Sequence, residues 1–202
     1  IDMALLDVQL ATLANQGMNY LATGENPRRL GNGHPNIVPY QTFATLDASL
    51  ILAVGNDAQF VRFCQVARCA ELADNPEFST NALRVRNRST LVPLLAEKIA
   101  QRKTTWWLER LEQIGVPCGP VNSVEQAVNH PQIKHREMIR QLPTPAGGQV
   151  PTVASPMKLS ATPVQYKNAS PDLGQDTRSV LINLLDYTEQ KVNGMFNRGI
   201  IA

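Results

Sequence analysis

The chain has 202 residues, of which 43% are apolar, and a formal net charge of +2. This composition is ordinary for a globular protein of one large domain or two small ones, and the balanced charge gives no reason to expect a nucleic-acid partner. No apolar run approaches the roughly 20 residues that span a bilayer, so no membrane segment is expected.

A helix is predicted over residues 3–20, where apolar side chains cover most of its faces. Such a helix is expected to be buried. Asp7 lies on one apolar stripe, where a carboxylate must be paired, hydrogen-bonded or raised in pKa, as functional acids often are. The alternative is a surface aspartate in the first turn that stabilises the helix through its dipole.

A loop rich in Gly and Asn follows at residues 31–36, in which positive φ angles would let the backbone approach a ligand closely. Hydrophobic strands are predicted at 38–43 and 50–54. Asn56 is then expected to cap a helix, with Gln59 in the position that a capping box gives to Glu or Gln.

That helix is predicted to run from residue 57 to 68 with an apolar core-facing side, and a second from 81 to 102 with a kink or break near Pro93. The second helix carries a basic cluster of Arg84, Arg86 and Arg88. A solvated face or intramolecular ion pairs are expected there rather than phosphate binding. The three cysteines, Cys64, Cys69 and Cys118, cannot all pair and match no zinc spacing. They indicate reduced thiols, a cytoplasmic protein and no metal site.

Trp106 and Trp107 open a further helix that ends at Gly115, and one of the two is expected to pack inward. Ser123 and Gln126 then form a capping-box pattern before a helix that stops ahead of Pro131. The last third predicts a hairpin of strands at 138–142 and 149–153, an extended linker at 156–171, a helix that follows residues 173–177, and a last helix at 188–196. The first of these two helices is expected to turn four apolar side chains inward: Val180, Leu181, Leu184 and Leu185.

Five short blocks stand out in chain order: Gly-Asn-Gly-His-Pro at 31–35 with Pro-Tyr at 39–40, Gly-Asn-Asp-Ala-Gln-Phe at 55–60, Arg-Val-Arg-Asn-Arg at 84–88, Gly-Val-Pro-Cys-Gly-Pro-Val at 115–121, and Leu-Gly-Gln-Asp-Thr at 173–177. Together they resemble the family III CoA-transferases, which include formyl-CoA transferase, L-carnitine dehydratase and bile-acid-inducible protein F. The blocks are most similar to members that move CoA from succinyl-CoA to another dicarboxylate.

The resemblance implies an α/β protein of the family III CoA-transferase fold, with a helical linker, a small α+β domain and a C-terminal return to the large domain. Residues 1–37 would be the catalytic-helix and Gly-rich loop segment of the large domain and linker, 38–155 the small α+β domain, and 156–202 the linker and helices that return to the large domain. Family members are about twice as long and form homodimers of interlocked rings. The chain begins at Ile1, so we expect a fragment that lacks the nucleotide-binding-type N-terminal half and is inactive alone.

The resemblance also implies the chemistry. Asp7 would attack the thioester of an acyl-CoA, form a mixed anhydride and then an aspartyl-CoA thioester, and pass CoA to a small carboxylic acid. Gly31, Asn32, Gly33 and His34 would bind substrate and shield these intermediates from water, although His34 fits equally well as a loop histidine bonded to backbone. No cofactor or metal is implied, and the CoA thioester is a substrate.

Two other functions stay open. An acyl-CoA racemase of the α-methylacyl type would use Asp7 together with a histidine outside this chain for proton transfer next to the thioester. A non-catalytic association fragment would instead bind its complement through an exposed apolar face of the helix at residues 3–20.

Overall fold

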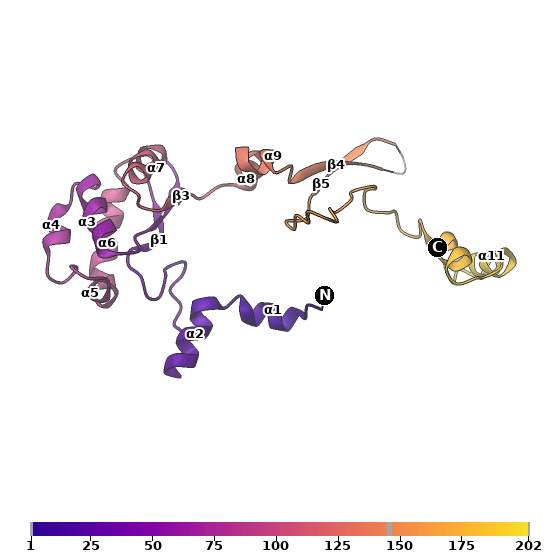
Figure 1. The fold of residues 1–202 in the computed structure, drawn as a ribbon, viewed down its shortest axis with the longest axis horizontal. Helices are drawn as coiled ribbons and strands as arrows, with labels where there is room; N and C mark the ends of the chain where they lie inside the picture. Colours follow the sequence, from indigo (N-terminus) through magenta and orange to yellow (C-terminus); the bar gives the residue numbers. More distant parts are fainter. Residues whose placement is uncertain (1, 145–146, 202) are drawn as a thin grey trace. The chain divides into compact units, whose positions relative to one another are not determined.

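The computed structural model describes residues 2–144 and 147–201 of the chain. They divide into two units, Ile1–Val121 and Asn122–Ala202, each with its own antiparallel sheet (Figure 1). Helices and small sheets alternate along the chain, which confirms the expected α/β class. The domain boundaries expected after residues 37 and 155 remain a prediction.

Two separate helices, α1 (Leu5–Ala11) and α2 (Ala14–Thr23), replace the single helix predicted over residues 3–20. Ala14 follows the break with φ +46°, which few residues other than Gly adopt. The predicted burial is wrong for this chain: Leu5 is 90% exposed and Leu6 79%. The apolar pattern is present, but nothing in the described part of the chain covers it.

The sheet of the first unit has the order β1 (Tyr40–Ala44), β2 (Ser49–Ala53), β3 (Cys118–Pro120), and both pairings are antiparallel. This confirms the strand pair predicted at 38–43 and 50–54. Leu50 and Leu52 point into the core, whereas Ile51 between them is exposed, as the alternation of side chains along a strand requires.

Five helices pack with this sheet: α3 (Asp57–Val66), α4 (Ala70–Asp74), α5 (Asn81–Arg86), α6 (Arg88–Ile99) and α7 (Thr104–Gln113). The buried apolar side chains of α3, α6 and α7 form one core with those of β1 and β2, and α4 and α5 pack partly buried side chains against it. The break predicted near Pro93 comes instead at Asn87, and Pro93 lies inside α6. Asn87 leaves the helical conformation, and its side-chain N–H donates a hydrogen bond to the Glu77 carbonyl. Pro93 lacks a backbone N–H, so α6 loses only one hydrogen bond there and continues through it.

Trp107 confirms the prediction that one tryptophan packs inward. It is 1% exposed, stacks on Phe63 and donates its indole N–H to the Ile99 carbonyl at 2.9 Å, so its polar atom is satisfied in the core. Trp106 is partly exposed, and the guanidinium groups of Arg102 and Arg110 lie over its ring. The cysteines are free thiols, as expected.

The second unit contains α8 (Val124–Asn129), α9 (Pro131–His135), β4 (Ile139–Pro143), β5 (Gln149–Val153), α10 (Thr177–Asn183) and α11 (Glu189–Asn197). Ser123 and Gln126 form the predicted capping box, and β4 and β5 form the predicted hairpin, part of whose turn lies outside the described residues.

The apolar side of α10 does not face inward as predicted. Leu184 is 74% exposed, and Val180 and Leu185 are exposed as well, whereas Leu181, the fourth predicted residue, is half-buried. Within the described ranges, no helix is both long and apolar enough to cross a membrane.

Candidate functional site

The loop at residues 31–36 begins with a tight turn. The Gly33 N–H donates to the Leu30 carbonyl at 3.0 Å, and Gly31 at the corner has φ +60°, a conformation that favours glycine. The backbone N–H groups of Gly31 and Asn32 make no hydrogen bond within residues 2–144 and 147–201. The turn therefore presents two adjacent unused donors.

The loop is attached to strand β1 by both its backbone and its side chains. Asn32 accepts a hydrogen bond from the Thr42 N–H at 3.2 Å, and the His34 N–H donates to the Tyr40 carbonyl at 2.8 Å. The imidazole also stacks on the Tyr40 ring, with 5.0 Å between centroids. Asn32 and His34, both predicted to bind substrate, thus hold the loop in place in this structure, and their contact with substrate stays a prediction.

The His34 ring is held in one tautomer. Its Nδ1 accepts the Asn36 N–H at 3.1 Å, so the neutral ring carries its proton on Nε2. The structure places Nδ2 of Asn15 2.8 Å from Nε2. A rotation of this amide by 180° exchanges its nitrogen and oxygen, and the oxygen is the atom that can accept the Nε2 proton. Burial, and next the positive charge of Arg88, lower the pKa of His34, which favours the neutral ring.

Helix α2 meets the loop through a polar face that the sequence reading missed. Asn15 and Asn19 are four residues apart and so share a helix face, where Asn15 meets His34 and Asn19 exchanges two hydrogen bonds with Asn36 at 3.0 and 3.3 Å. The i,i+4 spacing of the asparagines is the signal that could have identified this face.

Arg88 supports the loop from the first turn of α6. Its Nη2 donates to the carbonyls of His34 and Pro35, both at 2.8 Å. A Cβ on Gly33 would lie 3.4 Å from Nη1 of the same guanidinium and 3.2 Å from the Leu30 carbonyl oxygen, so a side chain at Gly33 would crowd both groups.

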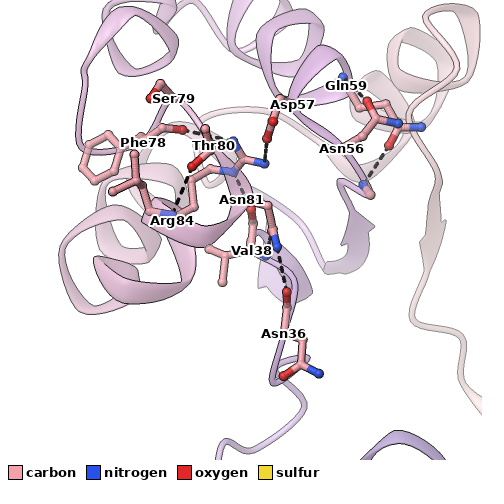
Figure 2. Close-up of polar contacts among 12 residues, drawn as sticks. Asn36, Val38, Asn56, Asp57, Gln59, Phe78, Ser79, Thr80, Asn81 and Arg84 are labelled. Atoms are coloured by element: carbon pink, nitrogen blue, oxygen red, sulfur yellow. Dashed lines mark hydrogen bonds and ion pairs between the residues drawn. The ribbon is translucent and has the colours of Figure 1, made fainter.

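Arg84 is the centre of a second group of contacts (Figure 2). It is fully buried, and it donates to the Val38 carbonyl at 2.8 Å, to the Phe78 carbonyl at 3.0 Å and to the Asp57 carboxylate at 2.7 Å. Its guanidinium lies over the Phe60 ring at 4.5 Å. The basic cluster thus supplies an intramolecular ion pair, one of the two roles expected of it.

The remaining contacts join the sequence blocks to one another. Asn81 donates to the Asn36 carbonyl at 2.8 Å and accepts the Val38 N–H at 3.1 Å (Figure 2). Asn56 caps α3 as predicted, and the Gln59 side chain joins the Gly55 N–H to the Gly115 carbonyl. Four of the five blocks are therefore parts of one hydrogen-bonded frame around the loop.

Asp7 lies apart from this frame in the first turn of the seven-residue helix α1, where it is exposed. Its side chain makes no hydrogen bond or ion pair within the described residues, and the structure does not join it to the Gly31–His34 turn. This position is the one that the surface alternative predicts, and the catalytic role of Asp7 stays a prediction. No group of three or more His, Cys, Asp or Glu side chains in the described ranges is arranged to hold a metal ion.

Comparison with known proteins identifies the family. Residues 1–177 match CoA-transferase family III. The chain is 42% identical over 184 residues to the succinate–glutarate CoA-transferase of Agrobacterium fabrum, covering 91% of this chain and 46% of that protein. It is 32% identical over 201 residues to the human succinyl-CoA:glutarate CoA-transferase, covering 100% of this chain and 46% of that protein.

The crystal structure of a CaiB/BaiF family protein from Brucella suis has the same fold, with a TM-score of 0.73 and 42% identity over 91% of this chain and 47% of that one. The chain therefore belongs to CoA-transferase family III. It spans about half the length of the curated relatives that it matches.

We predict that Arg84→Met lowers the free energy of unfolding of the first unit by about 3 kcal/mol, because two buried carbonyls and the Asp57 carboxylate lose their donor. Urea unfolding followed by tryptophan fluorescence measures this, since both tryptophans lie in that unit. The exposed Arg86 is the matched control, and Arg86→Met should change stability by no more than about 0.5 kcal/mol. Equal effects of the two substitutions would contradict the role of Arg84.

We predict that His34 makes the first unit less stable in mild acid. Folding lowers the pKa of His34, so the unfolded chain binds the proton more readily than the folded chain does. As the pH falls below about 6.5, the pKa of histidine in the unfolded chain, protonation therefore favours unfolding and the first unit loses stability. Urea unfolding at several pH values should show less of this loss in His34→Gln. The control is His135→Gln, which lies in the second unit and should leave the pH dependence of the first unit's stability unchanged. A pH dependence that His34→Gln does not change would contradict the assignment.

Proposed function

We propose that the complete protein transfers CoA from an acyl-CoA donor, succinyl-CoA, to a dicarboxylic acid such as glutarate. The observation that carries this proposal is the similarity, over nearly all of this chain, to two CoA-transferases named for succinate or succinyl-CoA and glutarate. The loop geometry supports it, because the turn at Gly31 exposes backbone donors that could bind an anionic group.

In the proposed mechanism, the Asp7 carboxylate attacks the thioester carbonyl and expels CoA as a thiolate, which leaves a mixed anhydride on Asp7. The thiolate then attacks the aspartyl carbonyl, releases the donor acid and forms an aspartyl-CoA thioester. The acceptor carboxylate reverses these steps and leaves as the new acyl-CoA. Covalent catalysis of this kind divides one difficult exchange into easier steps. The exposed Asp7 side chain is not engaged by other described groups, so it is available for this role.

The Gly31–His34 turn has two tasks in this mechanism. The free N–H groups of Gly31 and Asn32 would stabilise the oxyanion that forms when the carbonyl is attacked. The turn would also keep water from the anhydride, which water would otherwise hydrolyse. The supports from β1, α2 and Arg88 fix the direction of these donors, and preorganised donors stabilise developing charge most effectively.

A second proposal concerns association. The residues that line an apolar hollow of about 710 Å³ beside α1 and α2 include Leu10, Leu13, Met18 and Leu21. Large exposed apolar surfaces commonly mark protein–protein contacts. This feature supports both the homodimer that the family resemblance implies and the alternative of an association fragment. The cytoplasmic location and the absence of a cofactor remain predictions.

We predict that Asp7→Asn in the complete protein reduces exchange of CoA between succinyl-CoA and glutarate by more than about 1,000-fold, because the amide is a far weaker nucleophile than the carboxylate. Chromatography of the acyl-CoA products measures the exchange. Asp2→Asn is the control, since Asp2 is also exposed near the start of the chain and should retain activity. Exchange at an undiminished rate in Asp7→Asn would exclude Asp7 as the nucleophile.

We predict that Gly31→Ala raises hydrolysis of the acyl-CoA relative to transfer. The new Cβ would meet no atom within 4 Å, so the change acts through the left-handed backbone, at a cost of about 1 kcal/mol, and moves the turn. Gly199→Ala is the control, because Gly199 has φ +64° and equally open space but lies in the second unit, outside the loop and its frame. If both variants partition between hydrolysis and transfer as the parent enzyme does, the loop does not shield the intermediate.

A further inference from the structure

Arg88 has more hydrogen-bond donors than the protein uses. A guanidinium carries five N–H groups, and Arg88 donates from Nη2 alone, to the carbonyls of His34 and Pro35. In the described ranges, neither Nη1 nor Nε has an acceptor, and no carboxylate lies within ion-pair distance of the side chain. Arg88 is therefore a fixed positive charge with unused donors.

These donors lie beside the loop. Nη1 is the guanidinium nitrogen closest to Gly33, since a Cβ at Gly33 would lie 3.4 Å from it. The side chain is partly buried, and this burial lowers the pKa of Arg88, although the group stays charged. Its charge also contributes to the lowered pKa of His34. A partly desolvated cation without an anion gains strongly from binding one.

Other cations near the loop are less suited to this role. Arg28 and Arg29 precede the turn, but both are exposed and neither makes a hydrogen bond in the part of the chain that the structure describes. Arg84 is fully buried and already bonded through all three of its nitrogens. Among the described cations near the loop, Arg88 alone combines a fixed position, partial burial and free donors close to Gly33.

A dicarboxylic acceptor supplies the missing anion. While one of its carboxylates takes CoA, the other stays ionised, and a site that excludes water must provide a partner for that charge. We infer that Arg88 binds the carboxylate that does not react and so selects dicarboxylic over monocarboxylic acids, an inference that rests on the proposed CoA transfer. Nη1 would donate to this carboxylate while Nη2 keeps its bonds to the loop.

The test compares two acceptors of equal chain length, glutarate and pentanoate, in the complete enzyme with succinyl-CoA as donor. In a reaction with a covalent intermediate, kcat/KM for the acceptor reports only the second half-reaction, so the carboxylate of the donor does not affect the comparison. In Arg88→Gln, the preference for glutarate over pentanoate should fall about 30-fold, the effect of one charge-assisted hydrogen bond. Arg88→Lys, which keeps the charge, should retain part of the preference.

Arg86→Gln is the matched control, since Arg86 is exposed two residues away, and its preference should equal that of the parent enzyme. An unchanged preference in Arg88→Gln would overturn the inference. So would an equal fall for both acceptors, because Arg88 would then support only the loop. A parent enzyme that transfers CoA to neither acid would instead overturn the proposed function, so the two failures can be distinguished.

Discussion

The loop, the sheet and the helices of the first unit depend on one buried cation, Arg84. Burying a guanidinium costs free energy unless its donors are satisfied, and here three groups from different segments satisfy them. Val38 leads into β1, Asp57 begins α3, and Phe78 ends the turn before α5. Because one side chain binds all three, these segments have one relative arrangement, and the removal of Arg84 would leave unsatisfied groups in each.

The orientation of the loop, which supports the proposed function, depends on helices α5 and α6. Arg84 and Arg88 are separated by the break at Asn87, which lets one arginine enter the core while the other meets the loop. Asn81 joins the two regions, since it bonds both Asn36 in the loop and Val38 beside β1. The backbone donors at the Gly31 turn are therefore held by the same interactions that hold the core. A loop supported in this way can keep its backbone N–H groups in the same orientation when substrate binds.

Sequence patterns predicted correctly the features that depend on residues close together in the chain or on strongly apolar side chains. The caps at Asn56 and Ser123 and the buried Trp107 depend on neighbours in the chain or on strong apolar preference, and the structure confirms them. The break at Asn87 was missed because Pro93 is the stronger signal in sequence, whereas a side-chain bond to Glu77 decides the outcome. The burial of α1 and α10 was mispredicted because burial depends on covering surfaces, which an apolar stripe does not specify. The contacts of Arg88 and of the asparagines join residues far apart in sequence, so they needed the structure.

The measurement that tests the central claim most directly is to trap the covalent intermediate. The complete protein would be incubated with succinyl-CoA, the aspartyl-CoA thioester reduced with borohydride, and the modified residue located by mass spectrometry. The account predicts a modification on Asp7 that glutarate removes when it is added before reduction. Modification of another carboxylate, or no modification together with exchange of the proton next to the thioester, would contradict it, and the second result would indicate a racemase.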